Sequence, residues 1–84
     1  MKERKTRVGT RVRYQDQANP YHEGTVENIY TDRWGTFVEI LWDQEYIETG
    51  IVLSPVSTIA IYTFDGMEAT PWGGNKGSWG VIDY

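Results

Sequence analysis

The sequence contains no cysteine and only one histidine among its 84 residues. Without cysteine the chain can form neither a disulfide nor a thiolate metal site, and one histidine cannot supply a histidine cluster, so we expect no metal site. The lack of disulfides is typical of the cytosol, which is the location we expect. Apolar runs are short and the residues after Met1 are charged, so we expect neither a membrane span nor a secretory signal.

Aromatic residues are abundant in this short chain, which contains 4 Trp, 6 Tyr and 2 Phe. A chain of this length makes one domain, near the lower size at which a single core is stable without disulfides or metals. Each large ring buries much surface, so a small core can still be filled. Such a core has room for only a few rings, and we expect the others at the surface or in an interface.

Basic residues are concentrated at the N-terminal end of the sequence. Six of the eight lie in the first thirteen positions, which carry a net charge of +5, whereas the remaining positions carry −9. This asymmetry predicts a basic tail and a basic strand attached to an acidic body.

Short segments of alternating polar and apolar residues, separated by turn residues, predict an all-β protein. We expect five strands, at residues 7–14, 24–30, 36–43, 45–53 and 59–64. In the first strand the alternation predicts an inner face of Val8, Thr10, Val12 and Tyr14 and an outer face of Arg7, Gly9, Arg11 and Arg13.

A further segment follows the fifth predicted strand. Asp65-Gly66 is a strong signal for a two-residue hairpin turn, because this pair tolerates the positive φ angles of a type I′ turn. The sequence therefore predicts a basic tail over residues 1–6, a barrel over 7–64 and a C-terminal β-hairpin extension over 65–84. The third strand has an apolar outer face at Phe37 and Leu41, which we expect Trp72 and Trp79 to cover. Alternatively, the two tryptophans pair with each other across their turn, and a partner covers this face.

Four landmarks of the sequence resemble those of SH3-like small β-barrels: Gly9-Thr-Arg-Val-Arg13, Gly24-Thr-Val26, Val38-Glu39 and Pro55-Val56. Similar landmarks occur in KOW and Tudor-like domains, which bind nucleic acid or protein tails, and in the plasmid-borne type II dihydrofolate reductases. The resemblance covers about residues 7–62 and implies an SH3-like five-stranded barrel.

The reductase comparison also bears on activity. That family carries a Val-Gln-Ile-Tyr segment before its Pro-Val, and the Gln, Ile and Tyr line the site where folate and the nicotinamide cofactor meet. Residues 51–54 of this chain are Ile-Val-Leu-Ser. The resemblance therefore implies the scaffold without the activity, and we expect neither an enzyme nor a cofactor.

Basic residues form the first candidate binding site. Arginines spaced along a strand can contact successive phosphates, and a basic tail adds a flexible electrostatic arm. Alternatively, the strand arginines pair with Glu27, Glu39 or Glu48 across neighbouring strands and form ordinary surface ion pairs. The candidate nucleic-acid contacts are Lys2, Arg4, Lys5, Arg7, Arg11, Arg13 and Arg33.

Aromatic residues form the second candidate site. A Tudor-like cage surrounds a cation with rings and a nearby acid, and its ingredients here are Tyr14, Tyr21, Trp34, Trp42 and Tyr46 with Asp32 or Asp43. Rings in a small barrel also serve as core, edge or interface residues. The candidate aromatic contacts are Tyr21, Trp34, Trp42, Tyr46, Trp72 and Trp79.

The sequence favours a small non-enzymatic binding module. Its expected partner is a nucleic acid or a nucleic-acid-processing protein, engaged through the basic first strand and the aromatic loops. The alternative is a protein–protein interaction or inhibitory module, of the kind that phages and plasmids encode, which uses its acidic, Trp-rich surface. Self-association into a homo-oligomer is a variant of this alternative.

Overall fold

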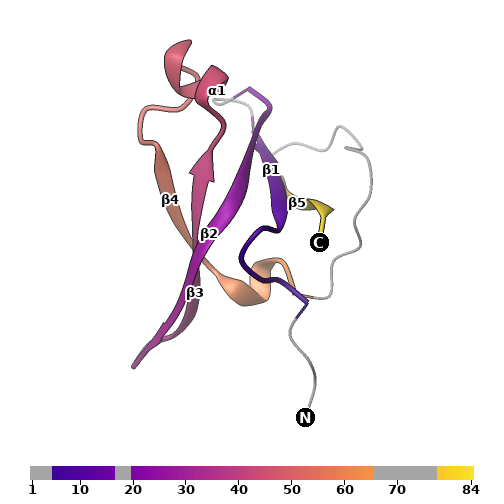
Figure 1. Ribbon diagram of the computed structural model, residues 1–84, viewed down its shortest axis with the longest axis vertical. Coiled ribbons are helices and arrows are strands. Elements are labelled where there is room, and N and C mark those ends of the chain that lie inside the picture. The colour runs from indigo at the N-terminus through magenta and orange to yellow at the C-terminus, as the bar shows by residue number, and fades with distance from the viewer. Residues whose placement is uncertain (1–4, 17–19, 66–77) are drawn as a thin grey trace.

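The computed structural model describes residues 5–16, 20–65 and 78–84. These residues form one antiparallel five-stranded sheet in the order β4-β3-β2-β1-β5 (Figure 1). The all-β prediction is confirmed, but within the described residues no pairing joins β4 to β5, so the sheet is open. Its elements are β1 (Arg11–Gln15), β2 (His22–Asp32), β3 (Gly35–Trp42), α1 (Gln44–Glu48), β4 (Val56–Ala60), the 3₁₀ helix η1 (Ile61–Thr63) and β5 (Ser78–Asp83).

The first predicted strand begins later than the sequence suggests. Residues 7–10 form a turn in which the backbone N–H of Thr10 donates to the carbonyl of Arg7 (3.0 Å), and Gly9 has a φ of +100° that favours glycine. Val8 therefore leaves the strand alternation and is 61% exposed. Its predicted place on the inner face is wrong.

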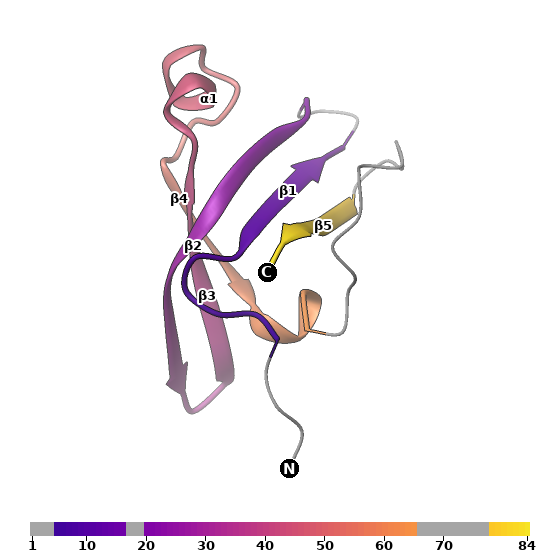
Figure 2. The ribbon, with the colours of Figure 1, turned by 45° about the vertical axis from the view of Figure 1, so that its right-hand side comes forward.

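Strands β2 and β3 form a long hairpin whose tip lies at the opposite end of the molecule from α1 (Figures 1 and 2). Two features fix the tip. The side-chain Oδ1 of Asp32 accepts the backbone N–H of Trp34 at 2.8 Å, and Gly35 has a φ of +135°. A short Asx turn and a glycine are how a tight hairpin connection is usually built, so the prediction of two strands joined here is confirmed.

The predicted fourth strand, residues 45–53, is instead helix α1 followed by a turn. Gln44, Glu45 and Glu48 are good helix formers, and the backbone N–H of Thr49 donates to the carbonyl of Glu45 (3.2 Å). Gly50, with a φ of +79°, ends the helix. The backbone N–H of Val52 then donates to the carbonyl of Tyr46 (3.0 Å), which returns the chain toward the sheet.

The predicted fifth strand, residues 59–64, is also wrong. Its first residues end β4, and Ile61–Thr63 form η1. The last strand of the sheet is β5, which lies inside the segment predicted as an extension and pairs with β1 (Figure 2). The predicted Asp65-Gly66 hairpin turn lies outside the described residues except for Asp65.

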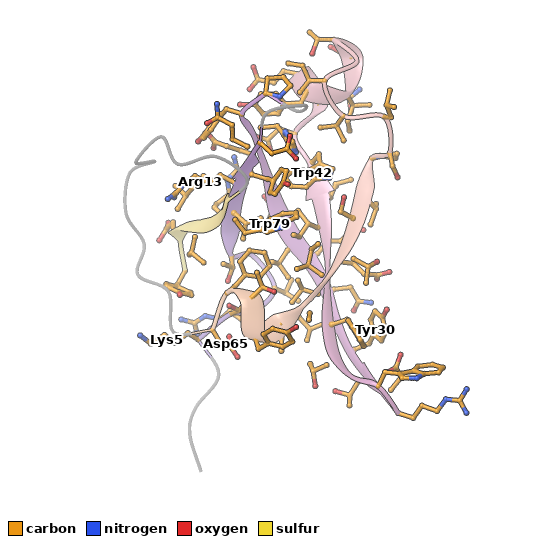
Figure 3. The ribbon with its side chains drawn as sticks, turned by 180° about the vertical axis from the view of Figure 1, so that it is seen from behind. Lys5, Arg13, Tyr30, Trp42, Asp65 and Trp79 are labelled. Carbon is orange, nitrogen blue, oxygen red and sulfur yellow. The ribbon has the colours of Figure 1, made fainter. Side chains whose placement is uncertain are left out.

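A compact set of apolar side chains fills the concave face of the sheet. Phe64, just after η1, is fully buried, as is Val81 of β5. Trp79 of β5 lies on this same face, with its ring centroid 5.8 Å from that of Trp42 (Figure 3). The buried apolar residues are Val12, Val26, Val38, Ile40, Trp42, Val52, Ile61, Phe64 and Val81.

The prediction that Trp79 covers the outer face of β3 is therefore wrong. Trp42 alternates along β3 with Leu41, so a ring stacked on Trp42 is on the opposite face from Leu41. Leu41 stays 43% exposed, and Phe37 packs against Tyr30 with a centroid distance of 5.8 Å. Trp72 lies outside the described residues.

Candidate aromatic groove

Five rings from five elements, β1, β2, β3, α1 and β5, converge at one end of the concave face. Tyr14 of β1 lies 4.4 Å from Trp79 of β5, centroid to centroid, and His22 of β2 meets the ring of Trp42 edge-on at 4.4 Å. Tyr46 of α1 lies 6.3 Å from His22. Such tilted and edge-to-face contacts are the preferred geometries of aromatic pairs, so the cluster is internally stable.

Beside these rings lies an open groove of about 370 Å³. Rings from β1, β2, β3 and β5 form one wall, and the connection from α1 to β4 with the first part of β4 forms the other. A volume of this order suits one or two side chains of a ligand. The lining residues are Tyr14, His22, Trp42, Ile51, Val52, Leu53, Ser54, Ser57 and Trp79.

Leu53 stands at the edge of this groove and is 95% exposed. It is the most exposed large hydrophobic residue in the described part of the chain. An isolated exposed leucine is ordinary, but one beside an aromatic groove extends an apolar surface that a ligand can cover.

The groove has few polar side chains, and hydrogen bonds hold two of them, His22 and Ser57, in place. The Nδ1 of His22 lies 2.7 Å from the carbonyl oxygen of Pro20; because a carbonyl only accepts, Nδ1 carries a proton, and in the neutral ring Nε2 is left as an acceptor. Ser57 Oγ accepts the indole N–H of Trp42 at 2.9 Å and can still donate its own hydrogen. The groove thus offers ring faces, an imidazole and hydroxyl groups.

Carboxylates lie next to the aromatic cluster and hold its tyrosines as hydrogen-bond donors. The hydroxyl of Tyr14 donates to Asp16 (2.7 Å) and that of Tyr21 to Glu23 (2.6 Å). The bond to Asp16, with burial, raises the pKa of Tyr14. Burial, with the bond to Glu23, raises the pKa of Tyr21, and burial raises that of Tyr46. All three phenols are therefore protonated at neutral pH.

Arg11 forms ion pairs with two acidic residues, Asp43 and Glu23. Its guanidinium donates to both oxygens of Asp43 (2.7 and 2.8 Å) and to Glu23 (2.9 Å). Hydrogen bonding to Asp43 is the main reason that the pKa of Arg11 is raised. The alternative of ion pairing across strands is thus what the structure shows for Arg11, although its partners are not the predicted Glu27, Glu39 or Glu48.

Arg13 is not on an exposed basic face. It is only 7% exposed, lies beside β5 (Figure 3), and donates to the carbonyl of Val81 at 3.2 Å. A Cβ on Gly80 would stand 2.6 Å from its Cζ, so glycine at that position makes room for the guanidinium. The predicted outer face of Arg7, Arg11 and Arg13 is therefore wrong, because of these three arginines only Arg7 is exposed.

The remaining candidate contacts fall in different places. Lys5 is exposed before β1, and Arg33 is exposed at the tip of the β2–β3 hairpin. There its Cζ lies 4.1 Å from the ring centroid of Trp34, which is 72% exposed. Trp34 is thus remote from the groove cluster. Lys2 and Arg4 lie outside the described residues.

The cage ingredients are only partly brought together. Tyr14, Trp42 and Tyr46 belong to the cluster. The hydroxyl of Tyr21 donates to Glu23. Trp34 and Asp32 are at the hairpin tip. Sequence reasoning missed His22, to which it assigned no binding role, and Leu53, which it placed in a strand. No local pattern marks either one, because their positions depend on where α1 and β4 meet the sheet.

Comparison with known proteins gives no relative: no family model, no curated protein and no solved structure matches the chain. Within residues 5–16, 20–65 and 78–84, no group of three or more metal-binding side chains gathers. None of the helices in that part of the chain has the length and apolar character needed to cross a membrane. The groove must therefore be interpreted from its own geometry.

Proposed function

We propose that this protein is a non-enzymatic binding module that takes an apolar side chain of a partner protein into the aromatic groove. The observation that carries the proposal is that Leu53, which is 95% exposed, stands at the edge of a groove walled by Tyr14, Trp42 and Trp79. Aromatic pockets with an apolar margin are where the few energetically dominant contacts of protein interfaces are usually made.

The charges around the groove favour a protein partner. Arg11 is neutralised by Asp43 and Glu23, and Arg13 is nearly buried, so the first strand leaves little positive charge for phosphates. Asp16 and Glu23 lie beside the rings. We therefore propose a partner segment with an apolar anchor and a flanking basic residue, because opposite charge at the margin of an interface speeds association.

We also propose that the fold is an SH3-like barrel. Two observations support this assignment: the strand order β4-β3-β2-β1-β5 and the 3₁₀ helix η1, which precedes the last strand. In this arrangement the groove lies between the rings of β1, β2, β3 and β5 on one side and the α1–β4 connection with the first part of β4 on the other.

A peptide selection tests the groove. From a library of random peptides, we expect the protein to enrich sequences with an aromatic or aliphatic anchor beside Lys or Arg. Leu53→Asp should weaken their binding at least about tenfold, or about 1.4 kcal/mol, because it puts a desolvated charge at the margin of the groove. Leu53 is so exposed that this change should leave stability within about 0.5 kcal/mol.

Leu41→Asp is the matched control. Leu41 is also an exposed leucine, but it lies on the opposite face of β3, so this variant should bind the selected peptides as the unchanged protein does. Isothermal titration calorimetry would measure both affinities. Equal weakening by the two substitutions, or a selection without any shared anchor, would rule out the groove as the binding site.

Nucleic-acid binding is the second candidate function, and the hairpin tip favours it. An exposed indole with a guanidinium beside it can stack on a base while the cation faces a phosphate, and Trp34 with Arg33 has this arrangement. Exposed Lys5 and Arg7 would add phosphate contacts. We expect Trp34→Ala to weaken binding of a labelled single-stranded oligonucleotide by about 1–3 kcal/mol, measured by fluorescence anisotropy.

Tyr62→Ala is the control for the tip, since Tyr62 is another highly exposed ring at a different place, 80% exposed in η1. It should leave the oligonucleotide affinity unchanged. The affinity should also fall steeply as salt rises, as phosphate contacts require. Binding that is insensitive to salt, or equally weakened by both substitutions, would exclude the tip.

A further inference from the structure

Among the residues that the structure describes, no strand pairs with the outer edge of β4, and the backbone groups of this edge can be assigned. The backbone N–H of Trp42 donates to the carbonyl of Pro55 (3.0 Å), so these two residues form a hydrogen-bonded pair of the antiparallel β3–β4 ladder. Such pairs alternate with non-bonded ones, and Leu41 faces Val56 in the next position. The N–H and C=O groups of Val56, Thr58 and Ala60 therefore point away from β3, toward the free edge. Two of these carbonyls already have one donor: that of Val56 accepts the hydroxyl of Ser54 (3.0 Å), and that of Ala60 belongs to the N-cap of η1 and accepts its first N–H.

This edge lacks the usual protection against pairing. Natural proteins protect exposed edges with charged residues, especially lysine, yet residues 49–64 contain no charged residue in a chain that is 24% charged. The other unpaired edges of the described sheet do carry charges. The hairpin part of β2 carries Glu27 and Asp32, and β5 carries Asp83.

Exposed apolar side chains flank the edge at both ends. Leu53 precedes β4 and is 95% exposed, and Tyr62 follows it and is 80% exposed. These are the two most exposed large hydrophobic residues in the described part of the chain. The edge and its two flanks together form an uncharged strip with an exposed apolar side chain at each end.

We propose that this edge is a self-association surface, on which β4 of a second copy pairs antiparallel with β4 about a two-fold axis at Thr58. The three outward residues are evenly spaced about Thr58, so Thr58 would pair with its own counterpart and Val56 with Ala60 of the other copy. This pairing uses the three outward N–H groups and the carbonyl of Thr58, and it gives the carbonyls of Val56 and Ala60 a second donor each, which their two lone pairs allow. An isologous contact requires this self-complementarity.

The flanks and the net charge favour a second copy as the occupant. The two-fold axis brings Leu53 of each copy to the same end of the paired strands as Tyr62 of the other, so each exposed apolar residue gains an apolar neighbour. Two copies with a net charge of −4 each repel one another, and the uncharged strip is where they approach with the least repulsion. Because β4 has only five residues, the contact is small and the dimer weak.

Sedimentation velocity on the full chain, from about 10 µM to about 1 mM, measures this dimer. We expect concentration-dependent dimerisation that Thr58→Pro and Thr58→Lys each weaken at least about tenfold. Proline removes an N–H that the fold itself does not use, and lysine places two like charges at the axis. Thr31→Lys, the same change at an exposed threonine of β2, should dimerise as the unchanged protein does.

Three outcomes would overturn the proposal. They are a protein that stays monomeric at the highest concentration, a dimer that survives both substitutions in folded protein, and a dimer lost in Thr31→Lys but not in Thr58→Lys. If Thr58→Pro fails to fold, the lysine variant decides.

An isotope-filtered nuclear Overhauser effect between Ser57 Hα and Ile59 Hα of different copies would identify the register. Neither variant changes a groove-lining residue, so peptide binding by the groove is tested separately.

Discussion

Deletion of residues 78–84 is expected to unfold the protein. These residues are the only described partner of the outer edge of β1, and they supply Trp79 and the fully buried Val81. The ring of Trp79 packs against three other rings, those of Tyr14, Trp42 and Phe64. Losing two such side chains removes about 3–6 kcal/mol of stabilisation by apolar burial. The hydrogen bonds between β1 and β5 are lost in addition. The total stability of such a domain is only about 5–15 kcal/mol.

Circular dichroism and a urea titration followed by tryptophan fluorescence would measure this loss. The control is the full-length chain with Asp83→Asn, which changes an exposed residue of the same strand and should unfold at nearly the same urea concentration. A deleted chain that still showed a cooperative transition close to that of the full chain would mean that β5 is dispensable. The sequence alone predicted that this region belongs to an extension covering the outer face of the third strand, rather than to the sheet itself.

Phe64→Ala is expected to lower the free energy of unfolding by about 3–5 kcal/mol, the usual cost of truncating a buried phenylalanine. Phe64 is fully buried and meets Trp79 edge-on with a centroid distance of 5.6 Å. Its backbone is fixed as well, because its N–H donates to the carbonyl of Ile61 and its carbonyl accepts the hydroxyl of Tyr84. The cavity left by alanine therefore has little freedom to collapse.

Tyr62→Ala provides a control of matched chemistry two residues away. Tyr62 is 80% exposed, so its truncation should change stability by no more than about 0.5 kcal/mol. Both variants should be compared by urea unfolding with the slope of the transition checked. Similar losses in the two variants would contradict the assignment of Phe64, rather than Tyr62, to the core.

The three strands whose existence the sequence predicted are those that local rules determine, although the first was predicted to begin too early. β1, β2 and β3 alternate with period two and are bounded by turn residues such as Asp32 and Gly35. Helix α1 has only five residues, too few for a helical period to be distinguished from alternation. Its identity depends on Tyr46 and Ile47 packing against the core, which is a tertiary effect.

The last strand was misplaced because its partner is distant in the sequence. Arg13 of β1 and Val81 of β5 touch across 68 positions, and no local pattern reports such a pairing. The same applies to the burial of Arg13, which depends on the space at Gly80. For the groove, the rings Trp42, Tyr46 and Trp79 were among the predicted aromatic contacts, whereas their convergence with His22 and Leu53 required the folded sheet.

The separation of β1 from β5 also matters while the chain is being synthesised. At about 5–20 residues per second, the ribosome needs roughly 3–14 s to advance from one strand to the other, whereas a hairpin such as β2–β3 forms in about 1–10 µs. The nascent chain therefore has its hairpin early but must wait for the partner of β1 and for the ring that covers Trp42. During those seconds an apolar sheet face and an open strand edge are available to chaperones, and to neighbouring nascent copies on the same messenger RNA.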